Sequence, residues 1–171
     1  MIHAMALAVE KNPMMKGVFK GDYIEVADDV NVGLAVAAPK GLVVPVVKNA
    51  SRKSLAETAK ETIELIEKAK INKLTLDEMY GACTTLTALG MFGIDSFLPI
   101  PSQGQCSIVS IGRIFETPIV TDGKIEAKKV IEFGVAIDSR VISPDYGAQF
   151  LMDIIDFMSN PEKMTNTNIS N

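Results

Sequence analysis

Few side chains in this sequence could act as a general base or a nucleophile at neutral pH. His3 is the only histidine in 171 residues, and its place on a predicted helix favours a packing or surface role. Cys83 and Cys106 lie in apolar stretches without a CxxC pattern, so we expect two buried, reduced thiols and no disulfide. Because metal sites need clustered histidine, cysteine or carboxylate ligands, no metal site is expected.

Charge and composition exclude two classes of function. The net charge is −4 and the pI about 5.1, with acidic and basic residues interspersed, so a nucleic-acid partner is not expected. The longest apolar stretch, residues 32–47, is interrupted by Pro39-Lys40-Gly41 and is too short for a membrane-spanning helix. The first residues carry no basic segment of a secretory signal. We therefore expect a protein that stays inside the cell and does not bind membranes.

The residues that could do chemistry must be positioned by alternating strands and helices. Ser54 and Glu57 form a capping box before a helix over residues 55–70, and Ser143 with Pro144 indicates the start of a second helix that ends near residue 160. Helices are also expected over residues 2–11, on the face of Ile2, Met5, Ala6 and Val9, and briefly after a second cap at Thr75 and Glu78. Strands are expected over residues 23–27, 32–38, 42–47, 83–86, 106–111, 117–120 and 129–137.

Local signals add detail to these elements. Pro45 indicates an edge strand or a bulge, and Thr121-Asp122-Gly123 indicates a hairpin turn. The helix over 55–70 carries an apolar stripe of Leu55, Ala59, Thr62, Ile66 and Ala69. We expect an α/β (α+β) fold in one domain, residues 1–161, with helices covering a mixed sheet. A polar tail, residues 162–171, is expected to be disordered. The hydrophobic content of 47% and the mean hydropathy of +0.21 predict an oligomer.

Three blocks of sequence, in this order, carry a family resemblance. They are residues 32–46 (VGLAVAAPKGLVVPV), residues 89–95 (LGMFGID) and residues 138–142 (DSRVI). Together they resemble the dihydrolipoamide acyltransferase catalytic domain of 2-oxo acid dehydrogenase complexes. The resemblance implies the two-layer fold that this domain shares with chloramphenicol acetyltransferase. It also implies that the chain begins after the usual start of that domain, so a truncation at the N-terminus is expected.

The same resemblance implies an activity and its ligands. The family moves an acyl group between dihydrolipoamide and coenzyme A, in a channel between subunits of a trimer. A thiol is a poor nucleophile at neutral pH, so a histidine takes its proton, and a hydroxyl of the neighbouring subunit stabilises the oxyanion. Coenzyme A and a lipoyl arm are thus possible ligands, with no covalent cofactor. A homotrimer or larger core, with other complex subunits as partners, in bacterial cytoplasm or mitochondrial matrix, is also implied.

Aligned without gaps, the family motif places different residues at its key positions. Ser139 stands at the histidine position, Ser143 at the following Asp or Asn position, and Thr87 at the oxyanion-donor position. Only Thr87 keeps its chemistry, since an unassisted serine hydroxyl cannot act as a base. Asp138 and Arg140 match positions that hold the motif loop by charge-assisted hydrogen bonds. The triplet Asp138-Ser139-Arg140 also resembles the non-catalytic component X of some pyruvate dehydrogenase complexes.

Three hypotheses follow from these substitutions. The first is a core subunit with lost or strongly reduced acyltransferase activity and a structural role in assembly. The second is an active acyl-coenzyme A-dependent transferase whose base is a carboxylate of raised pKa, Asp145 or Asp138. The third is a truncated remnant without biochemical function, against which the intact caps and apolar periodicity argue.

Overall fold

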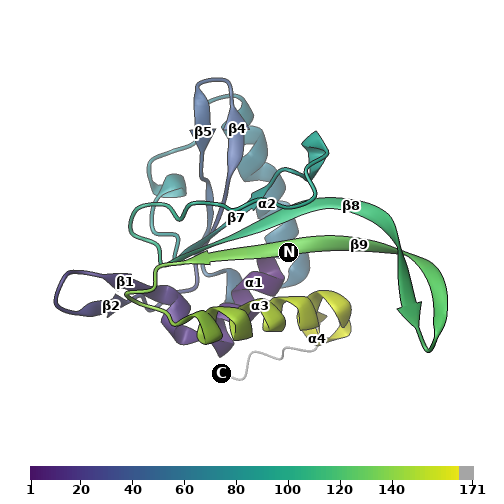
Figure 1. Ribbon diagram of the computed structural model, residues 1–171. Coiled ribbons are helices and arrows are strands. Elements are labelled where there is room, and N and C mark those ends of the chain that lie inside the picture. The colour runs from purple at the N-terminus through teal and green to yellow at the C-terminus, as the bar shows by residue number, and fades with distance from the viewer. Residues whose placement is uncertain (166–171) are drawn as a thin grey trace.

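Five strands form the central sheet, and helices cover it. In the computed structural model, which describes residues 1–165, the strand order is β6-β3-β7-β8-β9. These strands are β6 (Val46–Val47), β3 (Val32–Leu34), β7 (Thr84–Ala88), β8 (Ser107–Thr121) and β9 (Lys124–Ile137). Strands β3, β7 and β8 run parallel, whereas the two edge strands are antiparallel to their neighbours. The sheet is therefore mixed, as predicted (Figure 1).

Helix α1 (Ile2–Lys11) lies at the centre of the packed helices. It contacts α3 (Pro144–Ser159), β3 and α2 (Leu55–Lys70). Residues 2–9 are all buried, so the predicted face is only part of its buried surface, as is usual for a helix that is apolar all round. The core cluster around it includes Met15, Val32, Val109, Ile142, Phe150 and Ile154.

Helix α2 begins at the predicted capping box. The Ser54 hydroxyl accepts the Glu57 N–H, and the Glu57 carboxylate accepts the Ser54 N–H. The buried side of α2, however, holds Thr58, Leu65 and Ala69, while Leu55 and Ala59 of the predicted stripe are exposed. The predicted stripe is therefore only partly buried: Ala69 is buried and Thr62 and Ile66 are half-buried, whereas its first two members are exposed.

The two strands predicted over residues 32–38 and 42–47 are each divided in the structure. After β3 and before β6 the chain forms a separate hairpin, β4 (Val36–Ala38) and β5 (Gly41–Val43). Pro45 immediately precedes the edge strand β6, where no N–H is required of it, as its position predicted. A further hairpin pairs β1 (Gly17–Phe19), which was not predicted, with β2 (Ile24–Val26).

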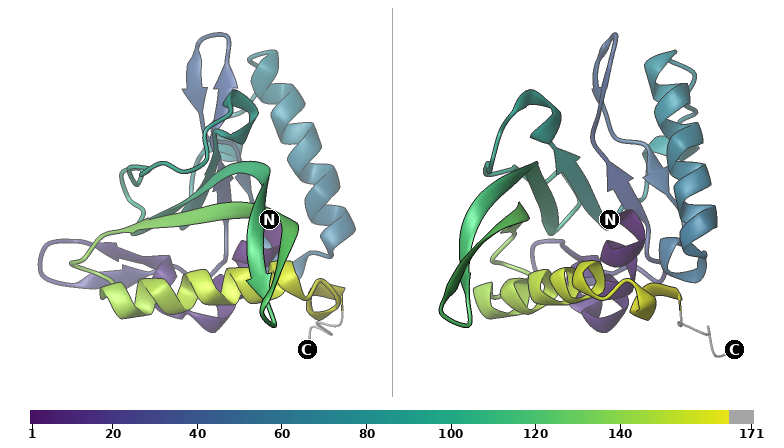
Figure 2. Two further views of the ribbon diagram at one scale, coloured as in Figure 1. Left: turned by 45° about the vertical axis from the view of Figure 1, so that its right-hand side comes forward. Right: turned by 90° about the vertical axis from the view of Figure 1, so that its right-hand side faces the viewer.

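Strands β8 and β9 form one long hairpin that leaves the body of the protein as a curved arm (Figures 1 and 2). The strands predicted over 106–111 and 117–120 are one strand, interrupted only by a register shift between Ile111 and Ile114. The predicted turn is present, with Asp122 at φ 51° and Gly123 at φ 77°, and it links the paired residues Thr121 and Lys124.

The structure corrects two further predictions, one after the second cap and one near the C-terminus. The cap at Thr75 and Glu78 forms, but only a 3-10 turn follows it, Asp77–Met79. The tail expected to be disordered from residue 162 is helical at its start, as α4 (Glu162–Thr165), where Met164 packs against the core. The rest of that expected tail lies outside the described residues. No helix among residues 1–165 is long and apolar enough to cross a membrane.

Candidate functional site

The turn between β9 and α3 carries Asp138, Ser139 and Arg140. The Asp138 carbonyl accepts the N–H groups of Val141 and Ile142, at 2.9 and 3.0 Å. Its carboxylate accepts the Arg140 backbone N–H at 3.0 Å and the guanidinium through Nε at 2.9 Å and Nη2 at 2.6 Å. These are the charge-assisted hydrogen bonds that the motif implied, and they hold the turn in one conformation.

The electrostatics of this turn oppose proton abstraction by Asp138. Hydrogen bonding to the Arg140 guanidinium lowers the pKa of Asp138 below its ordinary value. The Arg140 guanidinium also lies 4.6 Å from the centre of the Phe19 ring, which adds a cation–π contact. Asp138 is therefore an ionised partner of Arg140 at neutral pH and a weak base.

Ser139 and Ser143 are both exposed. Ser143 occupies the N-cap of α3, with Pro144 at the first helical position, although its hydroxyl accepts no capping hydrogen bond. Hydrogen bonding to the Ser143 hydroxyl lowers the pKa of Asp145, which stays at the surface. Asp145, like Asp138, thus has the opposite shift from the one that a carboxylate base would need.

Thr87 does not meet Ser139 within one chain. Thr87 of β7 pairs with Ser110 of β8, and Ser110 pairs with Gly134 of β9. Ser139 lies beyond Ile137, which is level with Thr84 at the other end of β7. The two positions are therefore separated by at least about 10 Å along the strands and about 10 Å across them.

A cleft of about 540 Å³ opens beside the β9–α3 turn. It is lined by Phe19 and Lys20, by the segment 101–105 and by Asp138 and Arg140. Two cations, Lys20 and Arg140, lie at this cleft, each with an acidic partner, Glu25 and Asp138 respectively. Sequence reasoning missed Phe19 and Lys20 because strand β1, which leads into the cleft, was not predicted.

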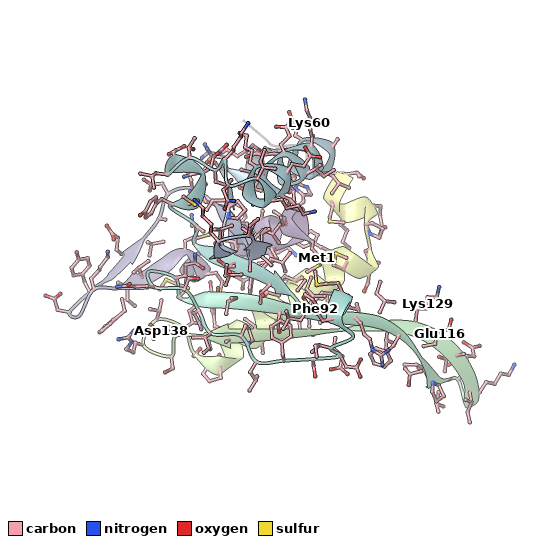
Figure 3. The ribbon with its side chains drawn as sticks, turned by 90° about the horizontal axis from the view of Figure 1, so that it is seen from above. Met1, Lys60, Phe92, Glu116, Lys129 and Asp138 are labelled. Atoms are coloured by element: carbon pink, nitrogen blue, oxygen red, sulfur yellow. The ribbon has the colours of Figure 1, made fainter. Side chains whose placement is uncertain are left out.

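The remaining candidates lie elsewhere or are chemically inert. His3 lines a different, larger cavity of about 640 Å³. Figure 3 shows that Met1, which is close to His3 in the chain, lies well away from Asp138.

Cys106 lies at the cleft, but burial raises the pKa of its thiol to about 11, so the thiol is protonated at neutral pH. Cys83 is also buried and free. Among the described residues no group of histidines, cysteines and carboxylates could hold a metal ion.

Comparison with known proteins extends this description. Residues 1–166 match the family model of the 2-oxoacid dehydrogenases acyltransferase (catalytic domain). A curated relative, the dihydrolipoyllysine-residue acetyltransferase component of the pyruvate dehydrogenase complex of Rickettsia felis, is 35% identical over 163 residues, 95% of this chain. The chain spans 40% of the length of that relative.

Solved structures share the fold. The cubic core of a pyruvate dehydrogenase multienzyme complex superposes with a TM-score of 0.89 at 31% identity, covering 95% of this chain and 68% of the other. The same values hold for a structure concerned with the role of one serine, one histidine and one asparagine in the catalytic mechanism of the Azotobacter vinelandii dihydrolipoamide acetyltransferase. A chloramphenicol acetyltransferase, at 15% identity and a TM-score of 0.55 over 91% of this chain and 76% of the other, shares the fold alone. The predicted fold class is confirmed.

Proposed function

The chain belongs to the family of 2-oxoacid dehydrogenase acyltransferase catalytic domains. On this premise we propose that it is a core subunit of a 2-oxo acid dehydrogenase-type complex. We further propose that its acyltransferase activity is lost or strongly reduced. Its role is then structural, in the assembly of the core. The observation that carries the proposal is a serine, Ser139, at the position where the family uses a histidine as general base.

The spacing of three residues supports this assignment. In the Azotobacter vinelandii enzyme the histidine follows the serine by 52 positions and precedes the asparagine by four. Thr87, Ser139 and Ser143 stand at the same separations in this chain. We therefore assign Thr87 to the hydroxyl position, Ser139 to the histidine position and Ser143 to the asparagine position.

The substitutions remove the proton acceptor and leave the frame. Loss of a general base lowers a rate by about 10²- to 10⁴-fold. Thr87 keeps a hydroxyl that could still donate to an oxyanion, and Asp138 and Arg140 keep the turn closed. Ser143 and Pro144 begin a helix instead of presenting a polar side chain to a substrate. A preserved fold without a general base supports a role in assembly over a role in catalysis.

Assembly also accounts for the distance between Thr87 and Ser139. Because these positions do not meet in one chain, we propose that they meet across the boundary between subunits of a homotrimer or larger core. The loop after β7 exposes Met91, Phe92 and Leu98, which are 74%, 72% and 91% exposed, and a neighbouring subunit would cover them. In this proposal coenzyme A or a lipoyl arm enters the channel formed there as a ligand that is bound but not turned over.

The alternative function is an active transferase with a carboxylate base. Asp138 and Asp145 were the candidates, and the pKa of each is lowered by its hydrogen-bond partner. A carboxylate of lowered pKa is a weaker base than an ordinary one, so the geometry supports the non-catalytic function better.

The compartment we propose is bacterial cytoplasm or mitochondrial matrix, where such complexes work.

The proposal is tested by sedimentation equilibrium together with a coenzyme A titration by calorimetry. We expect a trimer or a larger species, and binding of coenzyme A without turnover. A protein that remains monomeric at a concentration of about 10⁻⁴ M would contradict the proposed core. Sedimentation of a Phe92→Glu variant tests the interface, since a charge on this exposed loop should dissociate the assembly without unfolding the chain.

A further inference from the structure

The outer part of the β8–β9 arm has one apolar side. From the pair Ile114 and Ile131 to the pair Thr121 and Lys124, the strands keep one register, so paired residues share a side and the sides alternate along each strand. Ile131 packs against the core, and its side of the arm therefore continues the helix-covered side of the sheet. We name the apolar residues on this side the arm face: Ile114, Pro118, Val120, Ile125 and Ala127.

The arm face is exposed, whereas the opposite side of the same arm is partly covered. Ile114, Val120 and Ile125 are 67%, 69% and 77% exposed, but Phe115 and Ile119 on the opposite side are half-buried. The arm extends beyond the body of the protein (Figure 2), and a two-stranded hairpin that packs on nothing is only marginally stable in water. A partner that covers the arm face would therefore stabilise the arm.

Covering the arm face would bury no unpaired charge. The charged side chains on this side of the arm are Glu116 and Lys129, which lie directly opposite each other on β8 and β9. Opposite charges in such a cross-strand pair stabilise each other. The surface that complements the arm face is therefore apolar and has no net charge.

The loop after β7 offers a surface of this kind. Four of its apolar residues form what we name the loop patch: Met91, Phe92, Leu98 and Ile100, which are 74%, 72%, 91% and 87% exposed. The charged residue of this loop is Asp95, and Arg113 of β8 balances it in an ion pair. The loop patch therefore matches the arm face in both polarity and charge.

The arm face and the loop patch belong to opposite sides of one sheet. Ser110 alternates along β8 with the core residues Val109 and Ile111, so its side chain is on the side away from the helices. Its hydroxyl donates to the Phe97 carbonyl at 3.0 Å, which places the loop on that side. In a two-fold contact both copies present the same face to each other, whereas surfaces that face opposite ways are joined head to tail, in a ring where the rotation closes.

We propose that the arm face of one copy of this chain packs on the loop patch of the next copy, in a head-to-tail assembly. A second copy is the occupant because this chain carries both surfaces, and they complement each other in polarity and charge. We rest this on the core assembly proposed above and not on the loss of activity. It identifies the surfaces in contact and the order in which the subunits follow one another.

Two variants of the full chain each damage one of the two surfaces. Ile125→Glu places a charge on the arm face and leaves the loop patch intact, whereas Phe92→Glu does the reverse. Thr117→Glu is the matched control, because Thr117 lies on the opposite side of the arm. Sedimentation equilibrium at about 10⁻⁴ M compares the native chain, each variant, and an equimolar mixture of Ile125→Glu and Phe92→Glu. Circular dichroism checks that each variant is folded.

The native chain and Thr117→Glu should assemble alike. Ile125→Glu and Phe92→Glu should each be monomeric alone, because a buried unpaired charge weakens the contact by at least about 100-fold. Their mixture should form a dimer with one copy of each variant. In that dimer the intact arm of Phe92→Glu packs on the intact loop patch of Ile125→Glu, and the damaged surfaces at its ends prevent further growth.

Three results would overturn this proposal while the native chain still assembles, so that the proposed core would stand. Assembly of Ile125→Glu like the native chain would exclude the arm face from the contact. Dissociation of Thr117→Glu to the same extent as Ile125→Glu would show that the contact is not specific to the arm face. A mixture that stays monomeric would exclude the head-to-tail order. A monomeric native chain would overturn both this proposal and the proposed core.

Discussion

Asp95 and Arg113 form an ion pair that joins the loop after β7 to the irregular point of β8. The Arg113 N–H also donates to the Ile94 carbonyl at 2.8 Å, at the place where β8 and β9 lose their register between Ile111 and Ile114. The bulge therefore frees backbone groups of β8 to bind the loop. This contact fixes the loop that carries Met91 and Phe92 near the end of the strand that carries Thr87.

Gly112 should be the least replaceable residue of this contact. A Cβ at this position would lie 1.5 Å from the Asp95 carbonyl oxygen, so the loop backbone must move. We expect Gly112→Ala to lower the free energy of unfolding by about 3 kcal/mol, measured by urea denaturation. The control is Gly123→Asn in the hairpin turn, where φ is 77° and the space is open, which should lower it by less than about 1 kcal/mol. Equal effects would contradict the tight approach.

The two serine N-caps should differ in their contribution to stability. Ser54 makes a capping box with Glu57, whereas the Ser143 hydroxyl accepts no capping hydrogen bond. We expect Ser54→Ala to lower the free energy of unfolding by about 1 kcal/mol and Ser143→Ala to lower it by only a few tenths. Thermal unfolding of the two variants, followed by circular dichroism, measures both losses. A larger loss for Ser143→Ala than for Ser54→Ala would contradict this expectation.

Stability should fall in acid partly through Asp138. Hydrogen bonding to Arg140 lowers the pKa of Asp138 in the folded state, so its contribution is full above the unfolded pKa of about 3.9 and is lost as the pH falls through the folded pKa. We expect Arg140→Gln to destabilise the protein at neutral pH and to flatten this acid loss. Urea denaturation across the range from about pH 7 to pH 2 measures both effects. An unchanged acid slope would show that the pair does not couple.

The thiols should be unreactive until the protein unfolds. Burial raises the pKa of Cys83 and raises that of Cys106 to about 11, and each Sγ donates to a backbone carbonyl, of Asn31 and Met15 respectively. We expect labelling by a thiol-specific disulfide reagent at about pH 8 to be at least about 100-fold slower than in denaturant. Fast labelling of either residue in the native protein would place that thiol at the surface.

Signals that act over a few residues predicted the structure well. The Ser54 cap, the Pro144 helix start and the Asp122–Gly123 turn each depend on groups that are close in the chain, and all three are present. Strand division was missed because it depends on partners: Leu34 pairs with β7, whereas Val36 pairs with Val43 in a separate hairpin. Nothing local to residues 32–38 encodes that change of partner.

The residues of the candidate site are a prediction from the sequence, and the structure adds their geometry. A motif placed Asp138, Ser139, Arg140 and Thr87, yet only the register of β7, β8 and β9 reveals that Thr87 and Ser139 lie apart. The cleft at Phe19 and Lys20 depends on the short strand β1, whose three residues give too weak a pattern. Similarly, the apolar stripe of α2 was visible in the sequence, but its exposure at Leu55 was not.

Acetyl transfer from acetyl-coenzyme A to dihydrolipoamide, with the acetylated product quantified by chromatography, tests the central claim most directly. The native protein and a Ser139→His variant are compared under the same conditions. We expect the native protein to be no faster than the uncatalysed reaction although it binds coenzyme A, and the histidine variant to recover part of the lost 10²- to 10⁴-fold, about the contribution of a general base. Native turnover well above the uncatalysed rate would contradict the claim that Ser139 replaces the base.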